Sequence, residues 1–375
     1  MFRLKTLAAF ALVATLALFS SVLTSSLADG GANHRVRNQH FGVSGGNVND
    51  HSSSFCCSGT LGSLVTIGST KYILSNNHVL GRSGAATVGD DVSQPGLIDN
   101  SCRVATIVGD FTAAAPLGSN VDAAVAQLRT GQMDSTGFIE DIGVPGSTIT
   151  NPSVGLSVAK SGRTTGFTTG TVSSVNTSVS VQYQQGCNQG KKFTVSYTNQ
   201  VVINSSTFSA GGDSGSLIVT NNASHNPVAL LFAGSSTTTI GNPIGEVLTK
   251  LGTALGSTVT FNGVASTGGG GGHAKGLDEI GPGGRQPFTP GVQSLMPELP
   301  QQAIDRVSAV LENHRANLMF QPGVMGVGVG LSNRAEGEGA IIIYVNKDAG
   351  NKPFLPESIE GIPVNVILTD QFIAF

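Results

Sequence analysis

The sequence of 375 residues lacks tryptophan and has few charges and few aromatic residues. Charged residues make up 11% of the chain, less than half of the usual share, and aromatic residues make up 6%. The formal net charge of −3 offers no basic excess to neutralise phosphates, so we expect no nucleic-acid partner. A hydrophobic fraction of 39% excludes a disordered chain. The 51 glycines are instead typical of short strands joined by many turns, and the length favours two domains.

Long apolar runs are confined to the first thirty residues. Arg3 and Lys5 precede an almost wholly apolar stretch, residues 6–23, and Ser26-Leu27-Ala28 then offers the small-x-small pattern of a signal-peptide cleavage site. A membrane anchor is the alternative, but no basic cluster follows the stretch. We therefore predict a signal peptide over residues 1–28, cleaved near Ala28. The mature protein is expected to be secreted or periplasmic and not bound to a membrane.

Cysteines are few, and all four fit an oxidising compartment. They are Cys56, Cys57, Cys102 and Cys187. Two disulfides among four cysteines allow three connectivities. A bond between the neighbours Cys56 and Cys57 would be strained, which favours pairing each of them with Cys102 or Cys187. No second CxxC or HxxxH accompanies them, so we expect no metal site, and nothing in the sequence calls for a cofactor.

Residues 35–262 predict an all-β region, in which short Val, Ile, Leu and Thr runs alternate with Gly, Asn, Ser and Pro turns. The predicted strands are residues 61–67, 71–74, 121–128, 172–183, 194–203, 216–219 and 228–233. A helical period first appears at residues 242–255. Residues 263–291, with five consecutive glycines, predict a linker. Residues 292–375 predict a small α+β accessory domain, in which Pro300 opens a helix and strands follow at 323–331, 339–346 and 362–369.

Three short segments of the β region carry residues suited to nucleophilic catalysis. Tyr72–Leu80 runs from an apolar strand to His78, Ser119–Ala126 has Asp122 opening a strand, and Ser209–Ser216 reads Ser-Ala-Gly-Gly-Asp-Ser-Gly-Ser around Ser214. A serine hydroxyl needs an adjacent base to attack at neutral pH. His78 is suited to take that proton, and Asp122 to fix the imidazole tautomer. The glycines before Ser214 let two backbone N–H groups, those of Gly212 and Ser214, point into one hollow as an oxyanion hole.

These segments resemble the three signatures of chymotrypsin-fold serine peptidases (trypsin-like, S1 type), in the order His, Asp, Ser. The run 160–166, Lys-Ser-Gly-Arg-Thr-Thr-Gly, is similar to the bacterial branch typified by alpha-lytic protease and the streptogrisins, and further motifs are similar to little-characterised bacterial trypsin-like proteins. The resemblance spans about residues 40–262 and implies two six-stranded antiparallel Greek-key barrels. Three positions depart from the pattern: Val79 follows the histidine, and Ala159 and Thr169 stand where that branch has cysteines.

The resemblance implies a secreted serine endopeptidase that hydrolyses protein or peptide substrates through an acyl-enzyme. The alternative is a catalytically weak or inactive trypsin-like binding module. Because this chain lacks an Ile-Val-Gly-Gly start, the resemblance assigns Lys160 as the ion-pair partner of a buried Asp213, with Arg163 as the competing candidate.

The substrate pocket implied by the fold lies just before the nucleophile and along the strand after it. Its predicted residues are Phe208, Ser209, Phe232, Ala233 and Gly234. None of them is acidic, so a cationic substrate side chain would find no partner. The two phenylalanines are expected to shorten the slot and to favour Ala, Val or Leu before the scissile bond.

Overall fold

The structure is a computed structural model that describes residues 34–187, 189–264, 298–334, 337–351 and 353–375. The predicted signal peptide and nearly all of the predicted linker lie outside these residues. Within the described ranges, no helix has both the length and the hydropathy needed to cross a membrane.

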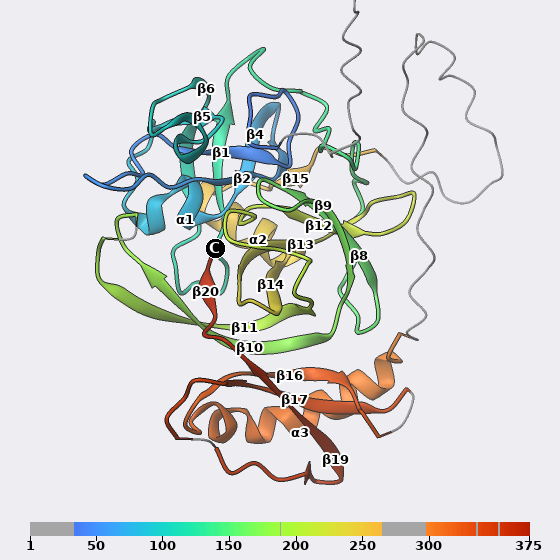
Figure 1. Ribbon diagram of the computed structural model, residues 1–375. Helices are drawn as coiled ribbons and strands as arrows, with labels where there is room; N and C mark the ends of the chain where they lie inside the picture. The colour runs from blue at the N-terminus through green and yellow to red at the C-terminus, as the bar shows by residue number, and fades with distance from the viewer. Residues whose placement is uncertain (1–33, 188, 265–297, 335–336, 352) are drawn as a thin grey trace, which may run out of the picture. The chain divides into compact units, whose positions relative to one another are not determined.

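The first sheet collects the strands that precede and surround His78, and all its pairings are antiparallel. Its eight strands follow the order β15-β3-β4-β7-β6-β5-β1-β2. They are β1 (Val43–Asn47), β2 (Gly59–Leu61), β3 (Ser63–Ile67), β4 (Thr70–Ser75), β5 (Asp91–Gln94), β6 (Thr106–Ala114), β7 (Ala124–Leu128) and β15 (Thr260–Phe261). The sheet curls around one apolar core, in which Leu64, Ile73 and Val125 are fully buried (Figure 1).

The second sheet carries Ser214 and continues into the last part of the chain. Its main path runs β18-β19-β17-β16-β10-β11-β14-β13-β12-β8-β9, and β20 lies off that path and pairs with both β10 and β13. The strands are β8 (Ser157–Gly162), β9 (Gly166–Thr171), β10 (Ser174–Gln184), β11 (Lys192–Asn204), β12 (Leu217–Thr220), β13 (Pro227–Gly234), β14 (Thr238–Pro243), β16 (Val324–Leu331), β17 (Gly339–Asn346), β18 (Ser358–Ile359), β19 (Ile362–Thr369) and β20 (Ile373–Ala374). The described chain is therefore mostly β, with barrel-like sheets, as the sequence predicts.

The helices are few. They are α1 (Asn77–Leu80), α2 (Ile244–Leu255) and α3 (Gln301–Met319), with short 3₁₀ turns η1 (Arg82–Gly84) and η2 (Leu97–Asn100). The apolar spacing that predicts α2 and α3 corresponds to their buried faces: Val247 and Leu251 enter the first core, and Val307 and Leu311 enter a second one. Gly256 ends α2 in the left-handed conformation, at a φ of 62°.

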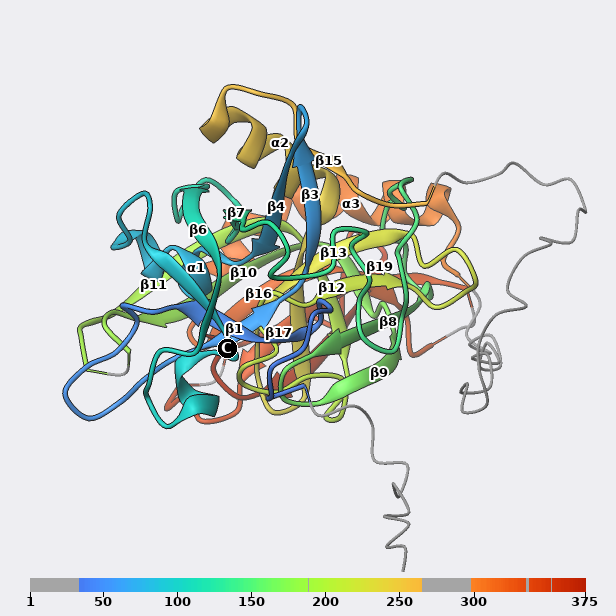
Figure 2. The same ribbon diagram turned by 90° about the horizontal axis from the view of Figure 1, so that it is seen from above.

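Strand β16 joins the last part of the chain to the barrel strand β10 by antiparallel pairing (Figures 1 and 2). A Cβ atom at Gly328 would lie 2.3 Å from the hydroxyl oxygen of Thr177 on β10, so glycine permits this close approach. Arg315 on α3 donates hydrogen bonds to the Asn176 carbonyl, at 3.1 Å, and to the Ser178 hydroxyl, at 2.7 Å. Two cores, the second and a third, contain side chains from both parts of the chain.

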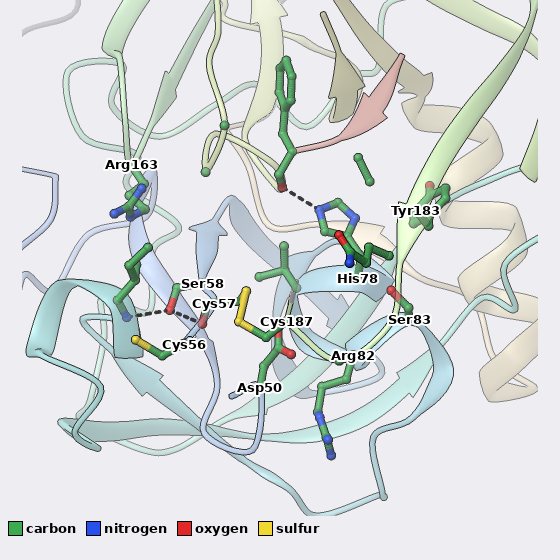
Figure 3. A pocket seen from close by; sticks show the side chains of 18 residues that line it. Asp50, Cys56, Cys57, Ser58, His78, Arg82, Ser83, Arg163, Tyr183 and Cys187 are labelled. Atoms are coloured by element: carbon green, nitrogen blue, oxygen red, sulfur yellow. Dashed lines mark hydrogen bonds between the residues drawn. A yellow bond between two sulfur atoms is a disulfide. The ribbon is translucent and has the colours of Figure 1, made fainter. Parts of the chain in front are cut away.

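Two disulfides occur, and they resolve the three connectivities open from the sequence. Cys56 pairs with Cys102, and Cys57 pairs with Cys187. The second disulfide links the segment before β2 to the turn between β10 and β11, and so ties the two sheets together beside the pocket in Figure 3. Disulfides of this kind are typical of extracellular or periplasmic proteins.

Candidate active site

His78 lies in α1, the single helical turn that follows β4, and its ring faces Asp122 at the start of β7. The His78 Nδ1 atom is 2.6 Å from Asp122 Oδ2, and the His78 backbone N–H donates to Asp122 Oδ1 at 3.1 Å. The Asp122 side chain is fully buried, whereas that of His78 is 13% exposed. The structure therefore brings these two predicted residues together and fixes the proton of His78 on Nδ1.

Asp122 is held from its other sides by groups that the sequence did not single out. The Tyr183 hydroxyl on β10 donates to Asp122 Oδ2 at 2.8 Å, and it lies 2.6 Å from the hydroxyl of Tyr197 on β11. The Asn242 side chain accepts the Asp122 backbone N–H at 2.9 Å. A buried carboxylate is costly unless hydrogen bonds satisfy it; the Tyr183 hydroxyl and the His78 backbone N–H donate to this one, while Asn242 fixes the Asp122 backbone.

The pKa of His78 results from opposing effects. Burial of the ring disfavours its protonation and lowers the pKa, but the charge of Asp122 and its hydrogen bond raise it. The Phe375 main-chain oxygen and, more weakly, the charge of Asp50 add to the increase. The net pKa lies above the ordinary value of 6.5. The ring therefore holds its second proton at pH values where a free histidine has lost it.

Ser214 is the predicted nucleophile, and it lies fully buried in the turn that precedes β12. Its hydroxyl donates to the Phe232 carbonyl on β13 at 3.1 Å, and its own carbonyl accepts the Thr60 N–H of β2 at 2.8 Å. The same Phe232 carbonyl also accepts the Phe375 N–H at 3.3 Å. The Phe375 main-chain oxygen in turn lies 2.9 Å from His78 Nε2. Phe375 thus contacts His78 directly and shares the Phe232 carbonyl with the Ser214 hydroxyl.

The backbone around Ser214 is oriented by hydrogen bonds to its carbonyls. Thr164 Oγ1 donates to the Gly211 carbonyl at 2.7 Å, and Ser216 Oγ donates to the Asp213 carbonyl at 2.6 Å. Because N–H and C=O point in opposite directions across a trans peptide, these bonds direct the N–H groups of Gly212 and Ser214 away from those partners. Gly212 has a φ of 95°, which only glycine adopts readily. This arrangement suits a pair of donors aimed at one oxyanion.

Asp213 is fully buried beside this turn, with the equally buried Lys160 of β8 at 3.5 Å. Thr165 donates to Asp213 Oδ2 at 2.7 Å, and the backbone N–H groups of Ala210, Thr164 and Thr165 also donate to the carboxylate. Burial lowers the pKa of Lys160 to about 8, although the charge of Asp213 opposes that decrease. The competing candidate, Arg163, pairs instead with Asp99 at 2.5 and 2.7 Å.

The predicted pocket residues lie around β13, and the rings of two of them belong to the apolar cores. Phe208 is fully buried in the second core, and Phe232 is fully buried in the third, where its ring centroid is 4.9 Å from that of Tyr197. The Ser209 hydroxyl lies 2.5 Å from that of Thr239. Gly234 contributes no side chain, and the Phe375 ring lies in the space beside it. The Phe232 ring therefore packs into the third core, and the length of the slot stays a prediction.

A pocket opens in front of His78, and residues from both sheets line it (Figure 3). In Figure 3, Arg163 and His78 lie on opposite sides of the view, and the disulfide between Cys57 and Cys187 lies between and below them. Phe375 is among the residues that line the pocket. No group of three His, Cys, Asp or Glu side chains in the described ranges is placed to hold a metal ion.

Two contributors to the site, Tyr183 and Phe375, escape the sequence analysis. Tyr183 lies within a predicted strand, where tyrosine is simply a good strand former. Phe375 is 297 residues from His78 in the sequence, and no local motif marks it.

Residues 73–236 match the family model of peptidase family S64. The chain is a serine-type peptidase. It is accordingly a hydrolase that acts on proteins or peptides, which confirms the activity class predicted from the three segments. The match includes the segments of His78, Asp122 and Ser214 and leaves the remainder of the chain unassigned. No protein with curated annotation matches the sequence.

Solved structures similar to this peptidase include several bacterial serine proteases. A glutamic acid specific serine protease is 22% identical, with a TM-score of 0.41, over 59% of this chain and 98% of that one. Protease A of Thermobifida fusca is 18% identical, with a TM-score of 0.38, over 60% and 98% of the two chains. An alpha-lytic protease homologue, N4, is 20% identical, with a TM-score of 0.38, over 60% and 98%.

Proposed function

We propose that this peptidase is a secreted serine endopeptidase that cleaves peptide bonds through an acyl-enzyme on Ser214. His78 takes the Ser214 proton as general base, and Asp122 holds the imidazole in the required tautomer. The N–H groups of Gly212 and Ser214 stabilise the oxyanion. The observation that carries this proposal is the 2.6 Å contact between His78 Nδ1 and the buried Asp122 carboxylate, beside a glycine turn that holds Ser214.

The architecture that goes with this mechanism is part of the proposal. Residues 35–262 would form two six-stranded antiparallel Greek-key barrels, and residues 292–375 an accessory region that does not catalyse. The first barrel carries His78 and Asp122, and the second carries Ser214. The ion pair of Lys160 with Asp213 supports the oxyanion turn, and residues 1–28 act as the signal peptide. Ala159 and Thr169, which replace a cysteine pair of the resembling branch, are direct partners across β8 and β9.

A fluorophosphonate probe tests the proposal, because it reacts only with an activated serine. We expect labelling at Ser214, its loss in Ser214→Ala, and its strong reduction in His78→Ala. Ser206→Ala, an exposed serine in the preceding loop, is the matched control and should label like the wild type. Because Phe375 contacts His78, labelling is measured both on the full chain and on a variant lacking residues 373–375. A folded protein that is unlabelled in both forms would favour an inactive binding module.

A further inference from the structure

Strand β20 pairs with both β10 and β13 of the second sheet and leads to the site (Figure 1). It pairs antiparallel with β13, with Ala374 opposite Ala233 and Ile373 opposite Gly234. On its other side, Ile373 is paired with Gln182 of β10 in parallel orientation. Addition of an extended segment to an existing strand is a recurrent way in which proteins bind peptides. Residues 373–375 are thus bound to β13 as a peptide ligand would be.

The next residue, Phe375, reaches the reacting groups. Its N–H donates to the Phe232 carbonyl at 3.3 Å, and its main-chain oxygen lies 2.9 Å from His78 Nε2. Its ring lies against Gly234, where a Cβ atom would come within 2.6 Å of the ring. The ring also packs against the second core, which contains Phe208. Phe375 therefore takes the position of the residue that precedes a scissile bond, with its side chain in the slot.

The segment is anchored just before it enters the cleft. Phe372 is fully buried in the third core, with its ring centroid 5.8 Å from that of Tyr344. Its carbonyl accepts the Gln182 N–H at 2.9 Å. The Ser235 hydroxyl of the peptidase region lies 2.6 Å from that of Thr369. These contacts hold the three following residues at the mouth of the cleft, at an effective concentration of about 1 mM, as for a short tether.

Occupancy by Phe375 removes the function of His78 as a base. Asp122 accepts the proton on Nδ1, so Nε2 binds the Phe375 oxygen only by donating a second proton. A ring that carries both protons cannot act as a base. The Ser214 hydroxyl meanwhile donates to Phe232. The arrangement in the structure is therefore a closed one, in which base and nucleophile are each bound to another partner.

We propose that residues 373–375 occupy the substrate cleft as an inhibitor within the chain, and that the cleft prefers an aromatic residue, preceded by a small one, before the scissile bond. This inference rests on the proposed function, since it names the substrate and the regulation of the same site. A free tripeptide with a Kd of about 100 µM, tethered at about 1 mM, would leave about one molecule in ten open. Removal of the segment should then raise activity about tenfold.

The first experiment measures hydrolysis of Ile-Ala-Phe anilide by the full chain, by a variant lacking residues 373–375 and by Phe375→Ala. Both variants should raise kcat/KM about tenfold, mainly through KM. Phe354→Ala is the matched control, because that phenylalanine is 94% exposed. It should behave like the wild type. Thermal melting of each variant verifies the fold, and Phe375→Ala keeps the test valid if the deletion fails to fold.

The second experiment varies the residue before the anilide in the deletion variant. Phe should exceed Ala and Arg at least tenfold in kcat/KM, and a preference for Ala would overturn the assigned specificity. Fluorophosphonate labelling separates the two proposals. Equal labelling rates in the full chain and the deletion variant would overturn occupancy and leave the peptidase mechanism standing.

If neither form is labelled, the mechanism fails, and occupancy is decided separately. Binding of fluorophore-tagged Ile-Ala-Phe is then measured on Ser214→Ala in the deletion background, which needs no nucleophile. Saturable binding that weakens about tenfold when residues 373–375 are restored to the same variant would support occupancy. Equal binding to both would overturn it.

Discussion

The hydroxyl of Tyr183 is the least expected contact of the site, and the substitution Tyr183→Phe removes only that oxygen. The ring keeps its edge-on packing against His78, at a centroid distance of 6.1 Å, and its stacking on Phe193, at 5.5 Å. Asp122 loses one of its donors and retains the two from His78. A hydrogen bond to a charged group contributes about 1.5–3 kcal/mol, and the buried Tyr197 hydroxyl would also lose its partner. We expect the free energy of unfolding to fall by about 3 kcal/mol.

Activity should respond through His78. Without the Tyr183 hydroxyl, the Asp122 charge is less neutralised and better able to hold a proton on His78, so the His78 pKa should rise further. Looser positioning of the carboxylate adds to the loss. We expect kcat/KM at pH 7 to fall about tenfold, equivalent to about 1.4 kcal/mol. The acid limb of the pH profile should move to higher pH.

The assay is kcat/KM against pH for an anilide substrate, combined with denaturant unfolding, in the background lacking residues 373–375. Tyr72→Phe, a half-buried tyrosine of β4, is the control and should change neither quantity appreciably. A double-mutant cycle with Tyr197→Phe should give a coupling of about 1 kcal/mol, because the two hydroxyls act in series. Lost stability with an unchanged pH profile would show that Tyr183 is purely structural and would refute the reasoning.

Three further outcomes follow from buried groups of the site. Lys160→Met leaves the Asp213 charge buried without a counterion, so it should lower the free energy of unfolding by about 3 kcal/mol and reduce labelling of Ser214. Lys192→Met, at an exposed position, is the control and should do neither. Cys57→Ser should cost about 5 kcal/mol by the chain-entropy model, because the disulfide that it breaks spans 130 residues. A loss below about 1 kcal/mol in denaturant unfolding would contradict this. The acid limb of kcat/KM should have its midpoint above pH 6.5 in the full chain, where Asp122 and Asp50 also face the His78 ring. Removal of residues 373–375 should move that midpoint to lower pH, because Phe375 binds only the doubly protonated His78 ring. A midpoint that the deletion leaves unmoved would contradict the assigned protonation. The raised pKa of His78 also contributes to folding stability, and this contribution is complete below pH 6.5 and is lost as the pH rises through the pKa of the folded protein.

The sequence predicts the strands whose apolar residues are frequent, and it misses those made of small residues. Residues 172–183 and 228–233 are predicted within two residues of the observed β10 and β13. Strand β1, Val-Ser-Gly-Gly-Asn, has neither alternation nor a branched run, yet all five residues are buried. Close packing explains that strand, because Leu61 fills the space that a side chain at Gly45 would take. Such a strand is determined by its neighbours, and no local pattern reports it.

The residues of the candidate site likewise divide into those that a local sequence pattern predicts and those that it does not. His78, Asp122 and Ser214 are predicted because each lies in a short segment whose chemistry is local. The inward turn of Phe232 is not predictable in this manner, since β13 changes register between Leu231 and Ala233 and so alters which side chains face the slot. The spacing along the chain cannot report such a shift, so the burial of the Phe232 ring in the third core follows from strand pairing and not from a local pattern.

Strand β20 shows how little structure is needed to close or open such a site. Its two residues and the following Phe375 have no predictive pattern, and Ile373 is 44% exposed even when bound. Opening need not disturb Phe372, whose burial contributes about 2 kcal/mol or more. It breaks the hydrogen bond of the Phe375 N–H, the contact with His78 and the short pairing to β13, each worth about 1 kcal/mol. Local openings of such small cost are frequent in folded proteins. The accessory region can therefore remain docked through β16 while residues 373–375 exchange with a substrate. Inhibition is then set by competition for the cleft, and the two regions do not need to separate.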